Sequence, residues 1–213
     1  MGCLLKQGGI HSRMRIGALV LAAHAVEGLG ALPAALVRLQ GVSFIRRQLV
    51  ALSGAGVDEV AIVTGAARHA LEEEVRPFSV RLAHDPGEGR DNAVTVRMGL
   101  KALEGPFDAV FIVPGELVLI GSGDLVELIG AFKKRPAGNA LVPAVGGIAG
   151  APALLDSVAQ ARRLEGEIDP ALVHRHESDN LRFVTRLEHA SDIESLAGRT
   201  GWRIEIPETE AVS

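Results

Sequence analysis

The sequence contains a single cysteine, Cys3, among its 213 residues. A disulfide needs two cysteines and a thiolate zinc cage needs more, so neither can be built within one chain. Basic residues are not in excess either, because 22 lysines and arginines stand against 26 acidic residues, which gives a net charge of -4. Proteins that hold nucleic acid through its phosphates usually carry a basic surplus, so we expect no nucleic-acid partner.

The sequence also lacks an apolar run long enough to cross a bilayer. The longest run, from Ile16 to Val26, is interrupted by His24, and a transmembrane helix needs about 20 apolar residues. Basic residues precede this run, as they do in a secretory signal, but the run is better explained as a buried first strand. These features predict a cytoplasmic protein with no membrane partner.

Hydrophobic residues make up 47% of the chain and charged residues 23%, which is typical of a globular protein. A chain of this length favours one compact domain. We assign that domain to residues 16–206, preceded by a flexible extension over residues 1–15 and followed by a frayed acidic tail over residues 207–213. Met14 is an alternative start, because residues 1–13 show no periodic pattern.

Short apolar runs alternate with longer amphipathic segments along most of the chain. Buried strands are predicted at residues 17–23, 60–64, 80–83, 109–113 and 140–143. Helices are predicted between them at residues 33–55, 67–75, 92–103 and 124–132, the last capped by Ser122. Beyond residue 145 the alternation ends, and we expect a helix or two, a strand over residues 181–185 and a helix after Ser191.

This alternation of strands and helices predicts parallel strands joined by right-handed helical crossovers. The predicted fold is therefore of the α/β class, a three-layer α/β/α sandwich with a mostly parallel, Rossmann-like sheet. Ligands of such sheets bind beyond the carboxyl ends of the strands. The segments in which to look for chemistry are residues 24–33, 65–68, 84–92, 114–121 and 144–152.

The turn after the first predicted strand holds Gly28 and Gly30, which would let backbone N–H groups cradle a phosphate. A dinucleotide fingerprint requires a third glycine where Pro33 stands, so an NAD site is not expected. Gly-Lys-Ser/Thr and Gly-x-Ser-x-Gly sequences are absent, which excludes a P-loop and argues against a serine hydrolase. His174 and His176 would share one face of a strand, but the sequence offers no third zinc ligand nearby.

Several segments carry a family pattern in a common order and spacing. They are Leu21-Ala-Ala23, Val63-Thr-Gly65, Asp85-Pro86, the helical Thr95-Val-Arg-Met-Gly-Leu100, Phe111-Ile-Val-Pro-Gly-Glu116 and Gly150-Ala-Pro152. Together they resemble the molybdenum-cofactor nucleotidyltransferases, the cytidylyl- and guanylyltransferases that have a MobA-like NTP transferase domain. The resemblance covers about residues 16–197, and it implies the nucleotidyltransferase version of the predicted sandwich.

The resemblance also implies a reaction and a set of site residues. The reaction is transfer of a nucleotidyl group from an NTP, CTP or GTP, to a molybdopterin-like or phosphorylated acceptor, with Mg²⁺ as cofactor. Glu116 would be catalytic and hold the metal, with Asp192 as a second metal ligand. The implied nucleotide-binding residues are Ala22, Ala23, His24, Gly30, Gly65, Asp85, Arg90 and Arg97. The implied partners are the nucleotide, a small-molecule acceptor and a molybdenum enzyme.

The first loop departs from the family pattern where the family neutralises phosphate charge. His24 replaces a glycine, Gly28 an arginine and Pro33 a lysine, whereas Gly30 matches the pattern. Glu116 stands where the family has its metal-binding aspartate. Because nucleotidyl transfer depends on positioning and charge neutralisation, two functions stay open. One is a divergent active enzyme, and the other is a catalytically inactive relative that binds a nucleotide, a pterin or a partner protein.

Overall fold

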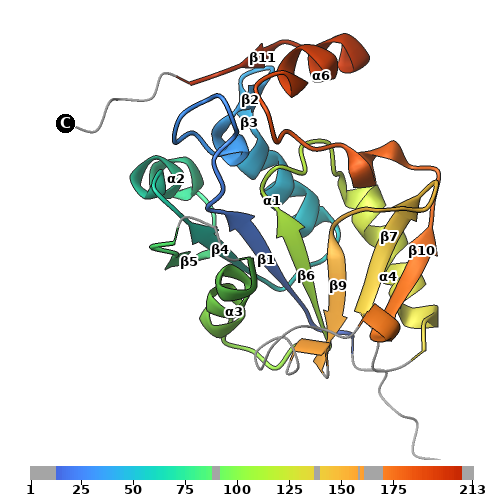
Figure 1. Cartoon of the computed structure of the whole chain (residues 1–213). Helices are drawn as coiled ribbons and strands as arrows, with labels where there is room; N and C mark the ends of the chain where they lie inside the picture. Colours follow the sequence, from blue (N-terminus) through green and yellow to red (C-terminus); the bar gives the residue numbers. More distant parts are fainter. Residues whose placement is uncertain (1–12, 88–91, 137–139, 158, 161–169, 208–213) are drawn as a thin grey trace, which may run out of the picture.

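The computed structural model describes residues 13–87, 92–136, 140–157, 159–160 and 170–207. The predicted extension and tail lie almost wholly outside the described residues. A central sheet runs in the order β10-β7-β9-β6-β1-β4-β5 (Figure 1). Its strands are β1 (Ile16–Ala22), β4 (Glu59–Thr64), β5 (Arg81–His84), β6 (Ala109–Pro114), β7 (Ala140–Val145), β8 (Ile148–Ala149), β9 (Ala153–Asp156) and β10 (Val173–Glu177). Strand β8 pairs with β7.

Strand β1 lies at the point where the chain changes its direction of travel across the sheet. It pairs in parallel with β4 on one side and with β6 on the other. The chain passes from β1 to β4 and β5 and then returns to β6, so the crossovers diverge between β1 and β6. Ligands of open α/β sheets bind at such a divergence, beyond the carboxyl ends of the two strands.

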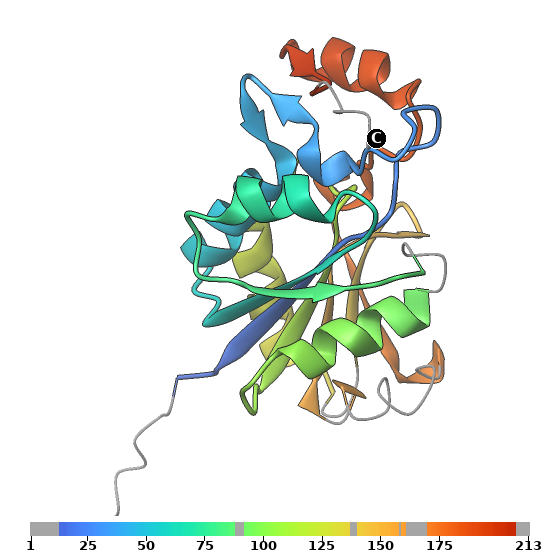
Figure 2. The same cartoon turned by 90° about the vertical axis from the view of Figure 1, so that its left-hand side faces the viewer.

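Helices cover both faces of the sheet, which confirms the predicted three-layer sandwich (Figures 1 and 2). Helices α1 (Phe44–Gly54) and α4 (Ser122–Lys134) pack against each other on one face, and α2 (Arg68–Val75) lies beside α1. Helix α3 (Asn92–Ala102) covers β1, β4 and β5 on the opposite face. Gly121, not Ser122, is the N-cap residue of α4, so the predicted cap is displaced by one residue.

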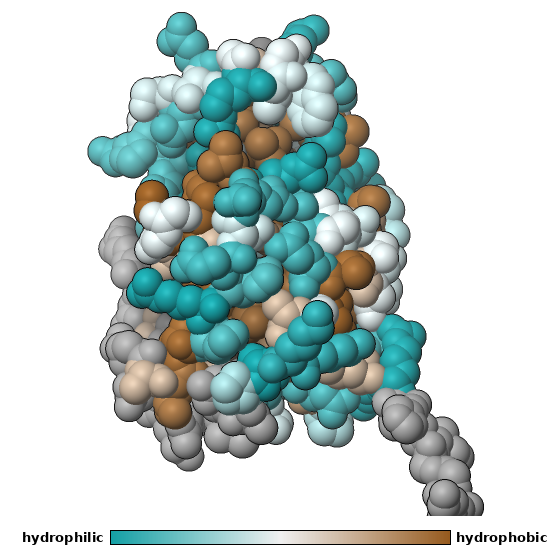
Figure 3. Space-filling view, turned by 90° about the vertical axis from the view of Figure 1, so that its right-hand side faces the viewer, coloured by the Kyte–Doolittle hydropathy of each residue, from teal (hydrophilic) through white to brown (hydrophobic). Residues whose placement is uncertain are grey.

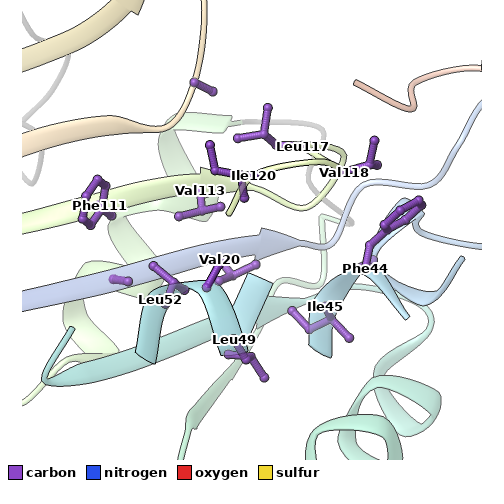
Figure 4. Close-up of a cluster of buried hydrophobic side chains, with 14 of the residues drawn as sticks. Val20, Phe44, Ile45, Leu49, Leu52, Phe111, Val113, Leu117, Val118 and Ile120 are labelled. Atoms are coloured by element: carbon purple, nitrogen blue, oxygen red, sulfur yellow. The ribbon is translucent and has the colours of Figure 1, made fainter. Parts of the chain in front are cut away.

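The core lies mainly between the sheet and α1. Val20 from β1, Phe111 and Val113 from β6, and Leu49 and Leu52 from α1 point into this layer (Figure 4). All five side chains are buried, and full burial of each stabilises the fold by about 1.5–3 kcal/mol before the entropy of ordering is subtracted. This packing holds the carboxyl ends of β1 and β6 side by side.

The sheet is less uniformly parallel than the alternation predicts. Strand β9 pairs antiparallel with β6 and with β7, and β8 pairs antiparallel with β7. The chain reverses between β7 and β8 at Gly146 and Gly147, whose positive φ angles of 58° and 81° permit a tight turn. Because no helical crossover separates β7 from β8 and β9, both of these short strands run antiparallel to β7.

The helix predicted over residues 33–55 forms only in its second half. Residues 34–36 form a 3₁₀ turn, and a two-stranded hairpin of β2 (Arg38–Leu39) and β3 (Val42–Ser43) precedes α1. Gln40 and Gly41 make its turn with φ angles of 53° and 78°, the left-handed conformations of a type I′ hairpin. Strand β11 (Ile204–Glu205) pairs with β2 and completes a small second sheet.

The last part of the chain contains a second difference from prediction. Residues 181–184 form a 3₁₀ helix instead of a strand, whereas β10 was not expected. The helix predicted after Ser191 is present as α6 (Asp192–Thr200). On the side of the molecule nearest β10, hydrophobic residues are exposed among hydrophilic ones (Figure 3). Among the described residues, no helix is both long enough and apolar enough to cross a membrane.

Candidate functional site

A cleft of about 600 Å³ opens where β1 and β6 end. Its walls come from the loop after β1, the first turn of α3, the end of β6, residues 150–153 and residues 186–189. Six polar or charged side chains that line it carry most of its chemistry, and these are His24, Glu27, Glu116, Arg186, Glu188 and His189. The cleft therefore occupies the place that the divergence of the crossovers predicts.

Two glycines hold the end of β1 in place. A Cβ atom on Gly65 would lie 2.6 Å from the carbonyl oxygen of Ala23, and one on Gly115 would lie 2.6 Å from that of Leu21. Any side chain at either position would collide with backbone. The close approach explains why glycine follows β4 and β6, and it brings Glu116, the next residue, to the floor of the cleft.

The loop after β1 is joined to the segment before α6 by backbone hydrogen bonds. The N–H of Glu27 donates to the carbonyl of Glu188 at 2.8 Å, and the N–H of Ala190 donates to the carbonyl of Glu27 at 2.8 Å. The N–H of Leu187 donates to the carbonyl of Glu116 at 2.9 Å. These bonds hold one short stretch, residues 186–190, against the loop after β1 and the end of β6, where residues 186–189 form one wall of the cleft.

Glu116 forms an ion pair inside the cleft. Its Oε1 lies 3.5 Å from Nη1 of Arg186, and the same Nη1 lies 3.4 Å from Oε1 of Glu188. Burial raises the pKa of Glu116, and the negative charge of Glu188 raises it further. The positive charges of Arg186 and His24 oppose this shift only in part. One guanidinium is thus shared by two carboxylates, and the more buried carboxylate is held in an environment that disfavours its charge.

His189 bridges two further carboxylates at the rim. Its Nε2 lies 3.1 Å from Oε2 of Glu27, and its Nδ1 lies 3.6 Å from Oδ2 of Asp192. The carboxylate of Asp192 also accepts the backbone N–H groups of His189 at 2.8 Å and Glu188 at 3.0 Å. The first of these bonds is the main reason that the pKa of Asp192 is lowered. Asp192 Oδ2 therefore orders the turn before α6.

The structure brings some predicted site residues into the cleft and leaves others outside its walls. The cleft is lined by Ala23, His24 and Glu116. Ala22 immediately precedes Ala23 in the sequence and is buried. Gly30 belongs to the adjoining loop, where its φ of 66° suits glycine. Gly65 and Arg97 are not among the lining residues that the structure describes. Arg90 lies outside the described residues.

Asp85 is 2% exposed, and its carboxylate accepts hydrogen bonds from neighbouring groups of the protein. One carboxylate oxygen accepts the hydroxyl of Thr95, and the other accepts the N–H of Gly87 at 2.8 Å. The bond from Thr95 joins the loop after β5 to α3, and the bond from Gly87 lies within that loop. Asp85 therefore positions α3, whose residues Asn92 and Thr95 line the cleft.

Arg186, Glu188 and Glu27 are the functional candidates that the sequence pattern missed. Arg186 lies in an irregular segment that makes isolated bridges, one from Arg186 to Leu117 and one from His189 to Glu27. The available signal was position, because the segment leads into α6, where the resemblance implies Asp192 as a metal ligand. Nothing in the local sequence indicates that Arg186 faces Glu116, since the two are brought together only by the fold.

The donor set of the cleft fits a magnesium ion that also binds phosphates. Mg²⁺ prefers oxygen ligands and commonly uses one or two carboxylates together with substrate phosphates. Glu116 supplies such a carboxylate, 23% exposed, at the cleft floor. Within the described residues no group of three or more histidines, cysteines or acids could hold a metal. The protein side chains therefore suit a metal that arrives with a nucleotide better than a permanently bound one.

A family model matches the part of the chain that forms the cleft. The model of the MobA-like NTP transferase domain matches residues 18–191. The chain belongs to the MobA-like NTP transferase family. The match includes the carboxyl end of β1, all of β6 and the segment with Arg186, so the cleft lies within the MobA-like domain. Among curated proteins no sequence matches.

Solved structures share the fold of this MobA-like domain at low sequence identity. Rv0371c from Mycobacterium tuberculosis H37Rv is 16% identical, with a TM-score of 0.70 over 87% of this chain and 98% of that chain. A nucleotidyl transferase from Methanothermobacter is 21% identical, with a TM-score of 0.69 over 88% and 97%. A CMP:2-keto-3-deoxy-manno-octonic acid synthetase complexed with CTP is 14% identical, with a TM-score of 0.65 over 88% and 98%. A second Rv0371c structure is a complex with manganese.

Proposed function

We propose that the protein is a divergent nucleotidyltransferase that binds CTP or GTP with Mg²⁺ in the cleft. It would transfer the nucleotidyl group to a molybdopterin-like or phosphorylated small-molecule acceptor. The observation that carries the proposal is Glu116, a carboxylate on the cleft floor at the end of β6, inside a domain that the family model covers. Related structures with CTP and with manganese support the same ligand classes.

The reaction places specific demands on the side chains of the cleft. An acceptor oxygen attacks the α-phosphorus, the bond from that phosphorus to the bridging oxygen breaks, and pyrophosphate leaves with the electron pair. Bound Mg²⁺ would supply charge neutralisation on the phosphates. Glu116 would hold the ion, and Arg186, 3.5 Å away, would turn from the two carboxylates toward a phosphate oxygen. Arg186 would thus supply a cation that the first loop lacks.

Partners follow from the same chemistry. A cleft of about 600 Å³ suits a nucleotide and a small acceptor. A molybdenum enzyme would be the receiver of the product if the acceptor is molybdopterin-like. We include neither nucleic acid nor a membrane among the partners, because the chain has no basic surplus and no long apolar run.

A second candidate function is nucleotide or pterin binding without transfer. It is favoured by the charges of the cleft, where three glutamates face one arginine and two histidines. A triphosphate is poorly neutralised by this set unless Mg²⁺ accompanies it. In this case the protein would deliver a bound ligand to a partner, and its cleft would bind the ligand without releasing pyrophosphate.

Calorimetric titration with CTP, GTP and ATP, with and without Mg²⁺, tests the proposal. We expect micromolar binding of one nucleotide that requires Mg²⁺. Substitution Glu116→Ala should weaken it by about tenfold or more, because the metal loses its protein ligand. Glu73→Ala removes an exposed carboxylate of α2 outside the cleft and should leave binding unchanged. Equal binding by the Glu116 variant and the unaltered protein would remove Glu116 from the site.

Transfer is then separated from binding by a second measurement. Pyrophosphate release is followed with the preferred nucleotide and a molybdopterin-like acceptor. Release that Glu116→Ala abolishes supports the enzyme. Tight Mg²⁺-dependent binding without release supports the binding protein, and absence of binding at millimolar nucleotide contradicts both.

A further inference from the structure

The segment that follows β6 borders two hollows. Glu116 lines the cleft, whereas Val118 and Ile120 line a second hollow of about 600 Å³. The other walls of this second hollow come from α1, the β2–β3 hairpin and the turn after α6. We call it the arginine groove and define it by Arg46, Arg47, Val50, Val118, Arg182 and Trp202.

The charge of the arginine groove is opposite to that of the cleft. Its described lining contains three arginines and no acidic residue. Arg46 shares Glu74 with a second arginine, Arg182 pairs with Asp124, and Arg47 forms no ion pair within the described residues. The groove therefore keeps a net positive charge in a chain whose formal net charge is -4, and it complements an acidic ligand.

Arg47 holds unused hydrogen-bonding capacity at the centre of this charge. Its Nη2 donates to the carbonyl of Leu39 at 2.7 Å, and its guanidinium lies 5.9 Å from the centre of the Trp202 ring. Its buried Nε has no hydrogen-bond partner. A guanidinium that is fixed by one bond and by a ring, but not neutralised, is prepared for an anionic oxygen.

The groove also exposes apolar surface that a simple anion would leave uncovered. Val50 is 63% exposed, Trp202 is 42% exposed and Val42 is 41% exposed. Tryptophan and arginine are the residue types most often found at the energetic centres of protein interfaces. The occupant that satisfies both the charge and the apolar surface is a peptide segment with acidic and large apolar side chains together.

We infer that the arginine groove docks an acidic segment of a partner protein that carries at least one large apolar side chain. The carboxylates of the segment would meet Arg47 and Arg182, and its apolar side chain would pack on Val50 and Trp202. The docked segment would also contact Val118, two residues from Glu116. This inference concerns a surface separate from the cleft and does not depend on nucleotide binding.

A library of random 12-residue peptides displayed on phage tests the inference with the full-length protein as bait. Selected peptides are synthesised with a fluorescent label, and their affinity is measured by anisotropy. Val50→Glu places a negative charge in the groove at an exposed position and should weaken binding about tenfold, since like charges would meet. Val50→Lys should retain it. Val126→Glu, the same change at a residue of α4 that is 53% exposed and outside the described groove, should have no effect.

The inference is supported if the selected peptides combine acidic with apolar residues and distinguish the two glutamate variants. It is overturned if no peptide is enriched, or if Val50→Glu binds the peptides as tightly as the unaltered protein does. Sedimentation of the unaltered protein supplies a further contrary outcome, because dimers that Val50→Glu separates would make a second copy of the chain the occupant. Circular dichroism and urea denaturation of each variant show independently whether it is folded.

Discussion

At the scale of single residues, the burial of Glu116 changes the pH range over which its carboxyl group titrates. Its carboxyl group is partly buried beside Arg186, and burial raises its pKa above the usual value. The folded protein therefore holds this proton to higher pH than the unfolded chain does. Stability from this group is fully present below the usual glutamate pKa and is lost as pH rises through the raised pKa.

Substitution Glu116→Gln should remove this loss. We expect the free energy of unfolding of the variant, relative to the unaltered protein, to increase as pH rises from acidic values through the raised pKa of Glu116. Urea denaturation at a series of pH values measures the difference. A difference that stays constant with pH would show that Glu116 titrates alike in both states.

Nucleotide affinity should change with pH in the opposite direction from this stability. A metal ligand must be ionised, so Mg²⁺-dependent binding should strengthen as pH rises through the raised pKa of Glu116. Calorimetric titrations at several pH values measure this change. Glu116→Gln carries no ionisable group at this position and is expected to lose both the binding and its dependence on pH.

At the scale of elements, two glycines within helices differ in the reason for which a side chain is absent. Gly99 of α3 lies against Leu19 of β1, and a Cβ atom there would overlap the leucine side chain. Gly130 of α4 has no atom within 4 Å of the place a Cβ would occupy. The first glycine is required by the close approach of helix and sheet, whereas the second only lowers helix propensity.

Alanine substitutions at these two positions should act in opposite directions. Gly130→Ala should stabilise the protein by about 0.5–1 kcal/mol, because alanine favours the helix. Gly99→Ala should destabilise it by about 1–3 kcal/mol, because the buried leucine must leave its position. Urea denaturation of both variants provides the comparison, and a stabilising Gly99→Ala would contradict the described packing of α3.

At the scale of the whole molecule, charge is distributed against the expectation for a nucleotide-binding fold. The cleft contains three glutamates, and the arginine groove on the other side of the segment after β6 contains three arginines. The chain carries a net charge of -4 in addition. The glutamates of the cleft would repel a free triphosphate, and pairing of the triphosphate with Mg²⁺ would reduce that repulsion.

Reversal of one charge at the cleft rim should therefore tighten nucleotide binding. Glu27 is an exposed residue whose side chain pairs with His189, and Glu27→Lys should increase affinity for the Mg²⁺-nucleotide by about three- to tenfold at low salt. Glu73→Lys changes the net charge equally on α2, away from the cleft. Equal effects of the two variants in calorimetry would show that net charge, and not the charge of the cleft, controls binding.

The sequence by itself determined the α/β class, the central strands and the edge of the sheet that bears the cleft. Apolar runs such as residues 109–113 are continuous because both faces of a central strand are covered. Such a run is a local pattern, so it can be recognised in a single sequence. The family segments also placed Glu116 at the end of β6. The helix predicted over residues 33–55 was wrong at its start, because apolar spacing does not distinguish a hairpin with a Gln40-Gly41 turn from a helix.

Only the tertiary structure decided which side chains meet. Arg186 reaches Glu116 because backbone bonds attach residues 186–190 to the ends of two strands, and those bonds join positions far apart in the chain. Nothing in the sequence around Asp85 and Asp192 indicates their hydrogen-bond partners. In the fold, the carboxylate of each accepts a backbone N–H, from Gly87 and from His189 respectively. The arginine groove likewise draws on α1, the hairpin and the turn after α6. Contacts of this kind depend on long-range packing, which no local pattern of residues encodes.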